Sequence, residues 1–137
     1  MGHRPFRAFA LALMLVAPVG RASAAPADSF GIWRNPGGSV HIRAERCGQA
    51  MCGTVVWASD KAKADARRGG TDPLIGTQLF RDFRPQQPNV WRGRVFVPDI
   101  GKTFSGTVRL IDADHLEGKG CLIGGIGCRS QVWTRLP

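Results

Sequence analysis

Four cysteines stand in two close pairs, and this residue type can form disulfides, exchange electrons or bind metal ions. Cys47 and Cys52 have four residues between them, whereas Cys121 and Cys128 have six. Neither spacing matches the shorter gap that thiol oxidoreductases and common zinc sites use. We therefore predict structural disulfides and no metal site. Of the three connectivities that four cysteines allow, the local pairing of Cys47 with Cys52 and of Cys121 with Cys128 is the one we expect.

Alternation along the strands predicts which way each pair faces. Cys47 shares a face with Glu45, so the first disulfide is expected on the outer side of a hairpin. The second pair leaves two alternatives open. If Cys128 faces outward, Arg129 and Gln131 face inward, where an arginine without a partner is costly. A bulge beside the glycine-rich loop would reverse this phase. In the first case, Arg129 and Gln131 are the best polar site candidates in the chain.

The first 24 residues have the pattern of a cleaved export signal. Arg4 and Arg7 give a positive start, residues 9–19 form an apolar run, and residues 22–24 supply small side chains for a signal peptidase. The apolar run is shorter than the ~20 residues that a membrane-spanning helix needs, so no transmembrane segment is expected. We predict a periplasmic or secreted protein whose residues 25–137 form one domain.

The basic composition favours anionic partners. Without the predicted signal, the chain keeps 16 basic and 10 acidic residues, a net charge of +6. Such an excess favours contact with anionic envelope polymers or lipid headgroups. Nucleic acid is not an expected partner, because the basic run at residues 61–68 contains no aromatic side chain for base stacking and is interrupted by Asp65.

Alternating hydrophobicity runs through most of residues 30–136 and predicts an all-β protein. Val40, Ile42 and Ala44 alternate with polar residues, and further strand-like runs lie near residues 52–58, 74–83, 91–97, 103–110, 116–121 and 128–136. With a short strand near residues 30–33, about eight strands result. Short turns between them favour an antiparallel meander that closes into a small barrel, since closure removes exposed sheet edges. Residues 60–72 are the exception, where both a single helical turn and a loop are left open.

Two tryptophan motifs near the ends of this region resemble the lipocalin arrangement. Gly31-Ile32-Trp33 opens the first predicted strand, and Trp133-Thr134-Arg135 closes the last. In lipocalins, a tryptophan on the first strand packs beneath an arginine from the closing segment of the barrel. The resemblance implies that Trp33 and Arg135 close this barrel together.

A wider set of motifs resembles the uncharacterised bacterial family called domain of unknown function 2147. Besides the two tryptophan motifs, the set comprises Cys47, Cys52-Gly53, Leu74-Ile75-Gly76, Trp91-Arg92-Gly93, residues 98–104, Gly120-Cys121 and residues 130–135. The resemblance implies an exported, lipocalin-like small barrel, and it implies no particular reaction. The basic, glycine-containing segment before Leu74 departs from the Asp- and Asn-containing stretch that family members tend to carry there.

Ligand binding is the function that we predict. A small apolar or amphipathic ligand would occupy the barrel mouth. The candidate lining comprises Trp57, Phe80, Phe83, Trp91, Phe96, Phe104, Arg129 and Gln131. The alternative interpretation of the aromatic side chains is that they simply fill the core, because eight strands enclose little spare volume. No metal or organic cofactor is implied.

Two other classes of function are the alternatives. An envelope-associated interaction protein without a ligand would use a basic surface comprising Arg67, Arg68, Arg81, Arg84, Arg92 and Arg94. A hydrolase-type enzyme would draw on Asp99, Lys102, Ser105, His115 and Glu117. Nothing in the spacing of these residues requires catalysis, and Asp99 is explained as a turn residue. We therefore expect no enzymatic activity, and the oligomeric state is left open.

Overall fold

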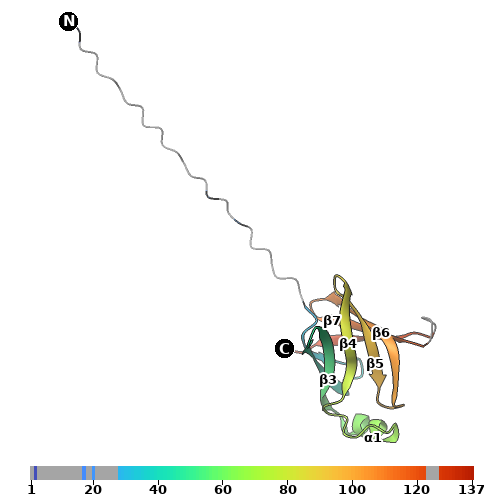
Figure 1. Cartoon of the computed structure of the whole chain (residues 1–137). Helices are drawn as coiled ribbons and strands as arrows, with labels where there is room; N and C mark the ends of the chain where they lie inside the picture. Colours follow the sequence, from blue (N-terminus) through green and yellow to red (C-terminus); the bar gives the residue numbers. More distant parts are fainter. Residues whose placement is uncertain (1, 3–16, 18–19, 21–27, 123–126) are drawn as a thin grey trace.

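The computed structural model describes residues 2, 17, 20, 28–122 and 127–137 (Figure 1). Nearly all of the predicted signal, residues 1–24, lies outside the described residues. In the described part, antiparallel strands follow one another in sequence order, and the last pairs with the first to close a barrel. The strands are β1 (Gly31–Arg34), β2 (Val40–Cys47), β3 (Ala50–Ala58), β4 (Gln78–Gln87), β5 (Val90–Val97), β6 (Lys102–Asp112), β7 (His115–Cys121) and β8 (Arg129–Arg135). This architecture confirms the predicted all-β meander.

A helix, α1 (Asp60–Arg68), interrupts the meander between β3 and β4 and is longer than the single turn considered for this segment. Ser59 caps it, because its Oγ accepts a hydrogen bond from the backbone N–H of Ala62 at 3.1 Å. Ala66 is fully buried in the main apolar core. Just beyond the helix, the Thr71 hydroxyl donates a hydrogen bond to the carbonyl of Pro98 at 3.1 Å. The helix therefore lies across the end of the barrel at which β5 turns into β6 (Figure 1).

The alternating direction of the strands gives the barrel two different ends. The β2–β3, β4–β5 and β6–β7 turns lie at one end, which we call the closed end. The β1–β2 turn, α1, the β5–β6 turn and the β7–β8 connection lie at the other, which we call the mouth. The Cys47–Cys52 disulfide spans the tight turn at residues 48–49 of the closed end, and the Cys121–Cys128 disulfide lies at the mouth. The local cysteine pairing is thus the one that the structure has.

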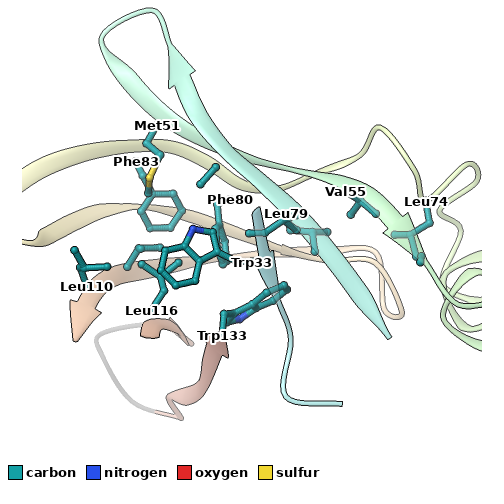
Figure 2. Packing of buried hydrophobic residues seen from close by; sticks show 14 of the residues in the cluster. Trp33, Met51, Val55, Leu74, Leu79, Phe80, Phe83, Leu110, Leu116 and Trp133 are labelled. Carbon is teal, nitrogen blue, oxygen red and sulfur yellow. The ribbon is translucent and has the colours of Figure 1, made fainter. Parts of the chain in front are cut away.

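Large apolar side chains fill the closed end (Figure 2). Trp33, Phe83 and Leu116 are fully buried there. Phe80 lies farther toward the mouth, and its ring packs edge-on against Phe83 and Trp133 at centroid distances of 5.6 and 5.7 Å. Phe80 therefore connects the core of the closed end with the interior surface near the mouth.

Arg135 holds the first and last strands together. In the described chain, β1 and β8 share only two residue pairs, one of which is Trp33 with Arg135. The guanidinium carbon of Arg135 lies 4.3 Å from the centre of the Trp33 ring. Its nitrogens donate hydrogen bonds to the backbone carbonyls of Asp28, Phe30 and Ala113. One side chain therefore compensates for a very short strand pairing.

We predict that Arg135→Ala lowers the free energy of unfolding by about 2–4 kcal/mol, since charged hydrogen bonds and the stacking contact are lost together. Arg135→Lys should recover only part of this, because an ammonium group cannot reproduce the planar fork of guanidinium donors. Urea unfolding followed by tryptophan fluorescence measures both changes.

Arg109→Ala is the matched control for this prediction. Arg109 is exposed and pairs loosely with Glu117 at 3.6 Å, so its removal should change stability by no more than about 0.5 kcal/mol. Equal losses for the Arg135 and Arg109 variants would contradict the role given to Arg135.

Candidate functional site

The register between β7 and β8 decides which way the strand after the second disulfide faces. Trp133 on β8 is buried in the core. Toward the mouth, Gln131 lies opposite Gly118, and Arg129 lies opposite Gly120. Residues two apart on a strand share a face, and no bulge interrupts this ladder. Gln131 and Arg129 therefore face the barrel interior, together with Trp133.

A cavity of about 620 Å³ lies inside the mouth. One wall is apolar and comes mainly from β4, β5 and β6. The facing wall is the inner face of β8, and α1 with the β1–β2 turn forms part of the rim. The apolar lining includes Leu74, Leu79, Phe80, Val95 and Phe104, and the polar lining includes Asn35, Ser39, Lys61, Asp65, Arg129 and Gln131.

Glycines on β7 keep this space open. Gly118 and Gly120 have inner-face positions and line the cavity directly opposite Gln131 and Arg129. A methyl group at Gly120 would meet its nearest neighbour, Val95, only at 3.7 Å, an ordinary van der Waals distance. The space beside Gly120 is therefore available to a larger group.

Three hydrogen-bond donors follow one another along the inner face of β8. They are the indole N–H of Trp133, the amide of Gln131 and the guanidinium of Arg129. The two indoles of the barrel differ in this respect. Trp33 donates its N–H to the carbonyl of Ser29 at 2.8 Å, whereas no described residue accepts a hydrogen bond from Trp133, and its Nε1 is not among the fully buried unpaired atoms. A Cβ placed at Gly118 would lie 3.7 Å from that Nε1 and 3.2 Å from the ring of Phe80, so Phe80 and Trp133 together occupy the space beside Gly118. Trp133 belongs to the cavity lining with Gln131 and Arg129.

Charges at the rim are partly neutralised by one another. Lys61 and Asp65, both on α1, form an ion pair at 2.7 Å, and Arg68 also contacts the Asp65 carboxylate. The hydrogen bond from Lys61, followed by the nearby charges of Lys61 and Arg68, lowers the pKa of Asp65 below its usual range. Asp65 is therefore already satisfied by two cations of its own helix.

The cavity also reaches the side of the barrel, because β1 is much shorter than β8. The two strands pair only at the closed end, where Arg34 lies opposite Thr134. Beyond that point, Asn35 and Ser39 of the β1–β2 turn line the same cavity as Gln131 and Arg129. Both inner-face polar side chains of β8 are exposed to solvent. The barrel wall is thus incomplete beside them.

Comparison with known proteins identifies the family. Residues 31–135 match the family described as "Uncharacterized protein conserved in bacteria (DUF2147)". The chain belongs to this family. None of the curated proteins compared with the chain matches it. A solved structure described as "Protein HP1028 from the human pathogen Helicobacter pylori belongs to the lipocalin family" superposes with a TM-score of 0.62 at 14% identity, covering 80% of this chain and 84% of that chain. At this identity, the likeness shows a shared lipocalin-like fold.

The predicted aromatic lining of this DUF2147 barrel divides into three groups. Phe80, Phe96 and Phe104 line the cavity. Phe83 is fully buried in the core, and Trp91 packs against the core as a half-buried side chain. Neither of these two residues contributes to the cavity wall. For them, the alternative interpretation as core filling describes their positions.

Trp57 corrects the sequence interpretation, because it lies on the outer surface with 44% of its area exposed. The pairing of β2 with β3 shifts between His41 and Ile42, which face Trp57 and Val55. The unpaired Val56 reverses the alternation, so Trp57 no longer shares the inward face of Val55. Outside the barrel, the rings of His41 and Trp57 are 4.5 Å apart. Partial burial, and then the charge of Arg34, lower the pKa of His41 below its usual range.

The residues considered for catalysis are not brought together. Asp99 lies at the mouth, whereas His115 lies at the closed end, where its Nδ1 is 2.8 Å from a carboxylate oxygen of Asp112. The backbone N–H of Asp114, and then the contact with His115, lower the pKa of Asp112. This pair belongs to the β6–β7 turn. Three further candidates, Lys102, Ser105 and Glu117, lie elsewhere on β6 and β7.

Sequence reasoning missed several residues of the cavity. Leu79 lines it beside Phe80, because the pairing of β3 with β4 shifts between Thr54 opposite Gln78 and Gly53 opposite Phe80, which leaves Leu79 unpaired. Gly120 and Trp133 are also absent from the predicted lining, although Trp133 alternates in phase with Arg129 and Gln131. Within residues 28–122 and 127–137, no three His, Cys, Asp or Glu side chains gather as metal ligands, and no helix is long and apolar enough to cross a membrane.

Two paired glycines provide a test of the cavity geometry. Gly106 on β6 lies opposite Gly120 on β7, but a methyl group at Gly106 would lie 2.6 Å from the backbone oxygen of Lys119. We predict that Gly106→Ala destabilises the barrel by about 1–3 kcal/mol through overpacking, whereas Gly120→Ala has little effect. Thermal and urea unfolding measure the difference. Equal destabilisation by both substitutions would show that no space exists beside Gly120.

Proposed function

We propose that this protein binds a small amphipathic ligand inside the mouth of its barrel, and that its task is binding and not catalysis. The observation that carries the proposal is the cavity of about 620 Å³ between an apolar wall and the polar inner face of β8. Ligand sites in proteins typically have volumes of ~300–1,000 Å³ and combine an apolar lining with a few polar groups. The cavity has both properties.

The contrast between the two ends of the barrel supports this proposal. Eight-stranded barrels can be filled by side chains or can hold one small ligand. Trp33, Phe83 and Leu116 occupy the closed end completely, so this part has no room for a ligand. The inner positions of β7 change to Gly118 and Gly120 toward the mouth. The same strand therefore fills one half of the barrel and leaves space in the other.

An oxidising compartment is part of the proposal. Disulfides persist in secreted and periplasmic proteins and are rare in the cytosol. The structure contains two of them, and no free cysteine is found in the described chain. Together with the predicted export signal at residues 1–24, this pairing supports a periplasmic or secreted site of action.

Filling the cavity should abolish binding. We predict that Gly120→Leu, whose side chain would extend toward Val95 and Phe104, weakens the binding of 1-dodecanol by about tenfold or more, equivalent to at least ~1.4 kcal/mol. Isothermal titration calorimetry and quenching of tryptophan fluorescence measure the affinity. Circular dichroism checks that the barrel is intact.

Lys119→Leu is the matched control, because Lys119 is the neighbouring residue on the outer face of β7. This variant adds the same leucine to the same strand without entering the cavity, so its affinity for 1-dodecanol should equal that of the wild type. Equal loss in the two variants, or no binding by the wild type, would refute the proposed site.

A second candidate function rests on a different surface, the outer face of β4 and β5. Arg81 lies directly opposite Arg94, and Arg84 lies directly opposite Arg92. Like charges directly opposite one another destabilise a sheet. Of the four, only Arg84 has a carboxylate partner among the described residues, the exposed Asp82 at 3.1 Å. Such a cluster is suited to binding an anionic envelope polymer, with or without a ligand in the barrel.

The same cationic face continues across the next two strands. Arg92 lies opposite Thr107 of β6, which in turn lies opposite Lys119 of β7. These three residues line an outer groove of about 820 Å³. The other two arginines of the predicted basic surface, Arg67 and Arg68, lie on α1 at the mouth and do not belong to this face.

We predict that the double variant Arg92→Gln/Arg94→Gln elutes from a phosphate-bearing polymer at lower salt than the wild type, because the cluster is lost. It should also be more stable, by roughly 0.2–1 kcal/mol for each relieved pair. The control is Arg67→Gln/Arg68→Gln, which removes the same charge elsewhere. An equal shift in elution for both double variants would show that only the net charge matters and would refute the surface.

A further inference from the structure

We propose that the ligand carries an anionic headgroup, a carboxylate or a phosphate monoester, and that Arg129 binds it. This inference rests on the proposed function and specifies the chemical class of the ligand. The apolar body of the ligand would lie against Phe80 and Phe104, and its charged end would lie along the inner face of β8. The inference follows from what β8 presents to the cavity.

Arg129 is a cation in the cavity without an ion-pair partner among the described residues. The register with Gly120 fixes its inward direction, and the residue belongs to the cavity lining. No described residue forms an ion pair or a side-chain hydrogen bond with it. The sequence of residues 123–126, which precede it, contains no acidic residue. Its guanidinium donors are therefore available, and their fork matches the oxygens of a carboxylate or phosphate.

The two residues that follow on the same inner face add donors in the same direction. Gln131 presents an amide, and Trp133 presents an indole N–H that no described residue accepts. A buried tryptophan normally donates its N–H to a protein acceptor, as Trp33 does to Ser29. A row of donors without facing acceptors matches a ligand that supplies acceptors only, and an ionised carboxylate or phosphate is such a group.

The other charges of the cavity do not remove this preference. On α1, Asp65 is paired with Lys61 and contacts Arg68. On the β5–β6 turn, Asp99 lines the rim but forms no ion pair with Arg129. Lys61 adds a second positive charge to the rim. Among the described residues, the cavity therefore has one unpaired cation at the mouth end of β8 and one unpaired anion on the β5–β6 turn.

The arrangement favours an anionic ligand because Arg129 shares the cavity with an apolar wall. Arg129 is solvated while the cavity is open, so it costs little in the free protein. An aliphatic chain that enters the cavity displaces water, which strengthens the interaction between Arg129 and an anion. A neutral alcohol of the same length would offer the guanidinium a single uncharged acceptor, and such a hydrogen bond is weaker than one to an anion.

The test compares two ligands that differ only at the polar end, dodecanoate and 1-dodecanol, on the full chain at pH 8 by isothermal titration calorimetry. The wild type should bind dodecanoate about tenfold or more tightly than 1-dodecanol, which is the usual size of a charge-assisted hydrogen bond. Arg129→Gln should lose this preference while binding 1-dodecanol as the wild type does. Dodecyl phosphate, titrated in parallel, distinguishes the two headgroups.

Arg43→Gln is the matched control, because it removes one positive charge from an exposed outer position of β2 that lines neither the cavity nor the outer groove, and it should keep the preference for dodecanoate. Loss of preference in both variants would assign the effect to net charge and overturn the inference. Equal binding of the two ligands by the wild type would also overturn it, while leaving the amphipathic ligand in place. A wild type that binds neither ligand would overturn the proposed function itself.

Discussion

The contact between Arg135 and Trp33 determines how the rest of the barrel is arranged. β1 contributes only four residues, so the backbone pairing of β8 with β1 is too short to fix the last strand firmly. The stacked guanidinium and its three carbonyl acceptors add this constraint. Since strand side chains alternate strictly, fixing Arg135 on the inner face also fixes Arg129 there. Arg135, which closes the barrel at its closed end, thereby also determines that Arg129 and Gln131 face the interior at the mouth.

The two halves of the barrel differ in how their interior is filled: side chains fill the closed end, and a cavity lies inside the mouth. Trp33, Phe83 and Leu116 are fully buried and pack together at the closed end. Toward the mouth, β7 has glycine at its inner positions, and a solid core is no longer possible without larger residues on the facing strands. Arg129 and Gln131 do not supply this volume, because both are exposed. Stability is therefore concentrated at one end, and the other end is free to take a ligand.

The sequence predicts this fold well, because alternation and short turns are local signals that tertiary contacts do not reverse. The cavity lining is harder to predict. Trp57 was placed on the wrong face since a bulge at Val56 has no sequence signature, and α1 was uncertain because its nine residues are mostly charged or alanine. The direction of Arg129 depended on the register with β7, a contact between strands that alternation along one strand cannot determine. The position of Cys128 showed that the direction of Arg129 and Gln131 was ambiguous, and the register between β7 and β8 resolved it.

Arg129 is best understood as a residue that the fold does not need. It is exposed, lies opposite a glycine and has no ion pair with any residue that the structure describes, so it contributes little to folding. The facing arginines on β4 and β5 repel one another across the sheet, although Arg84 pairs with Asp82 at 3.1 Å and the Arg81 guanidinium lies 4.2 Å from the centre of the Phe96 ring. Natural proteins accept such local costs at functional sites. The outer cluster and the inner arginine share a sign, so under the proposed binding role the field of the outer face would raise the local concentration of anionic ligands near the cavity. A net charge of +6 over residues 25–137 would then act on association, and the single inner cation would act on selectivity.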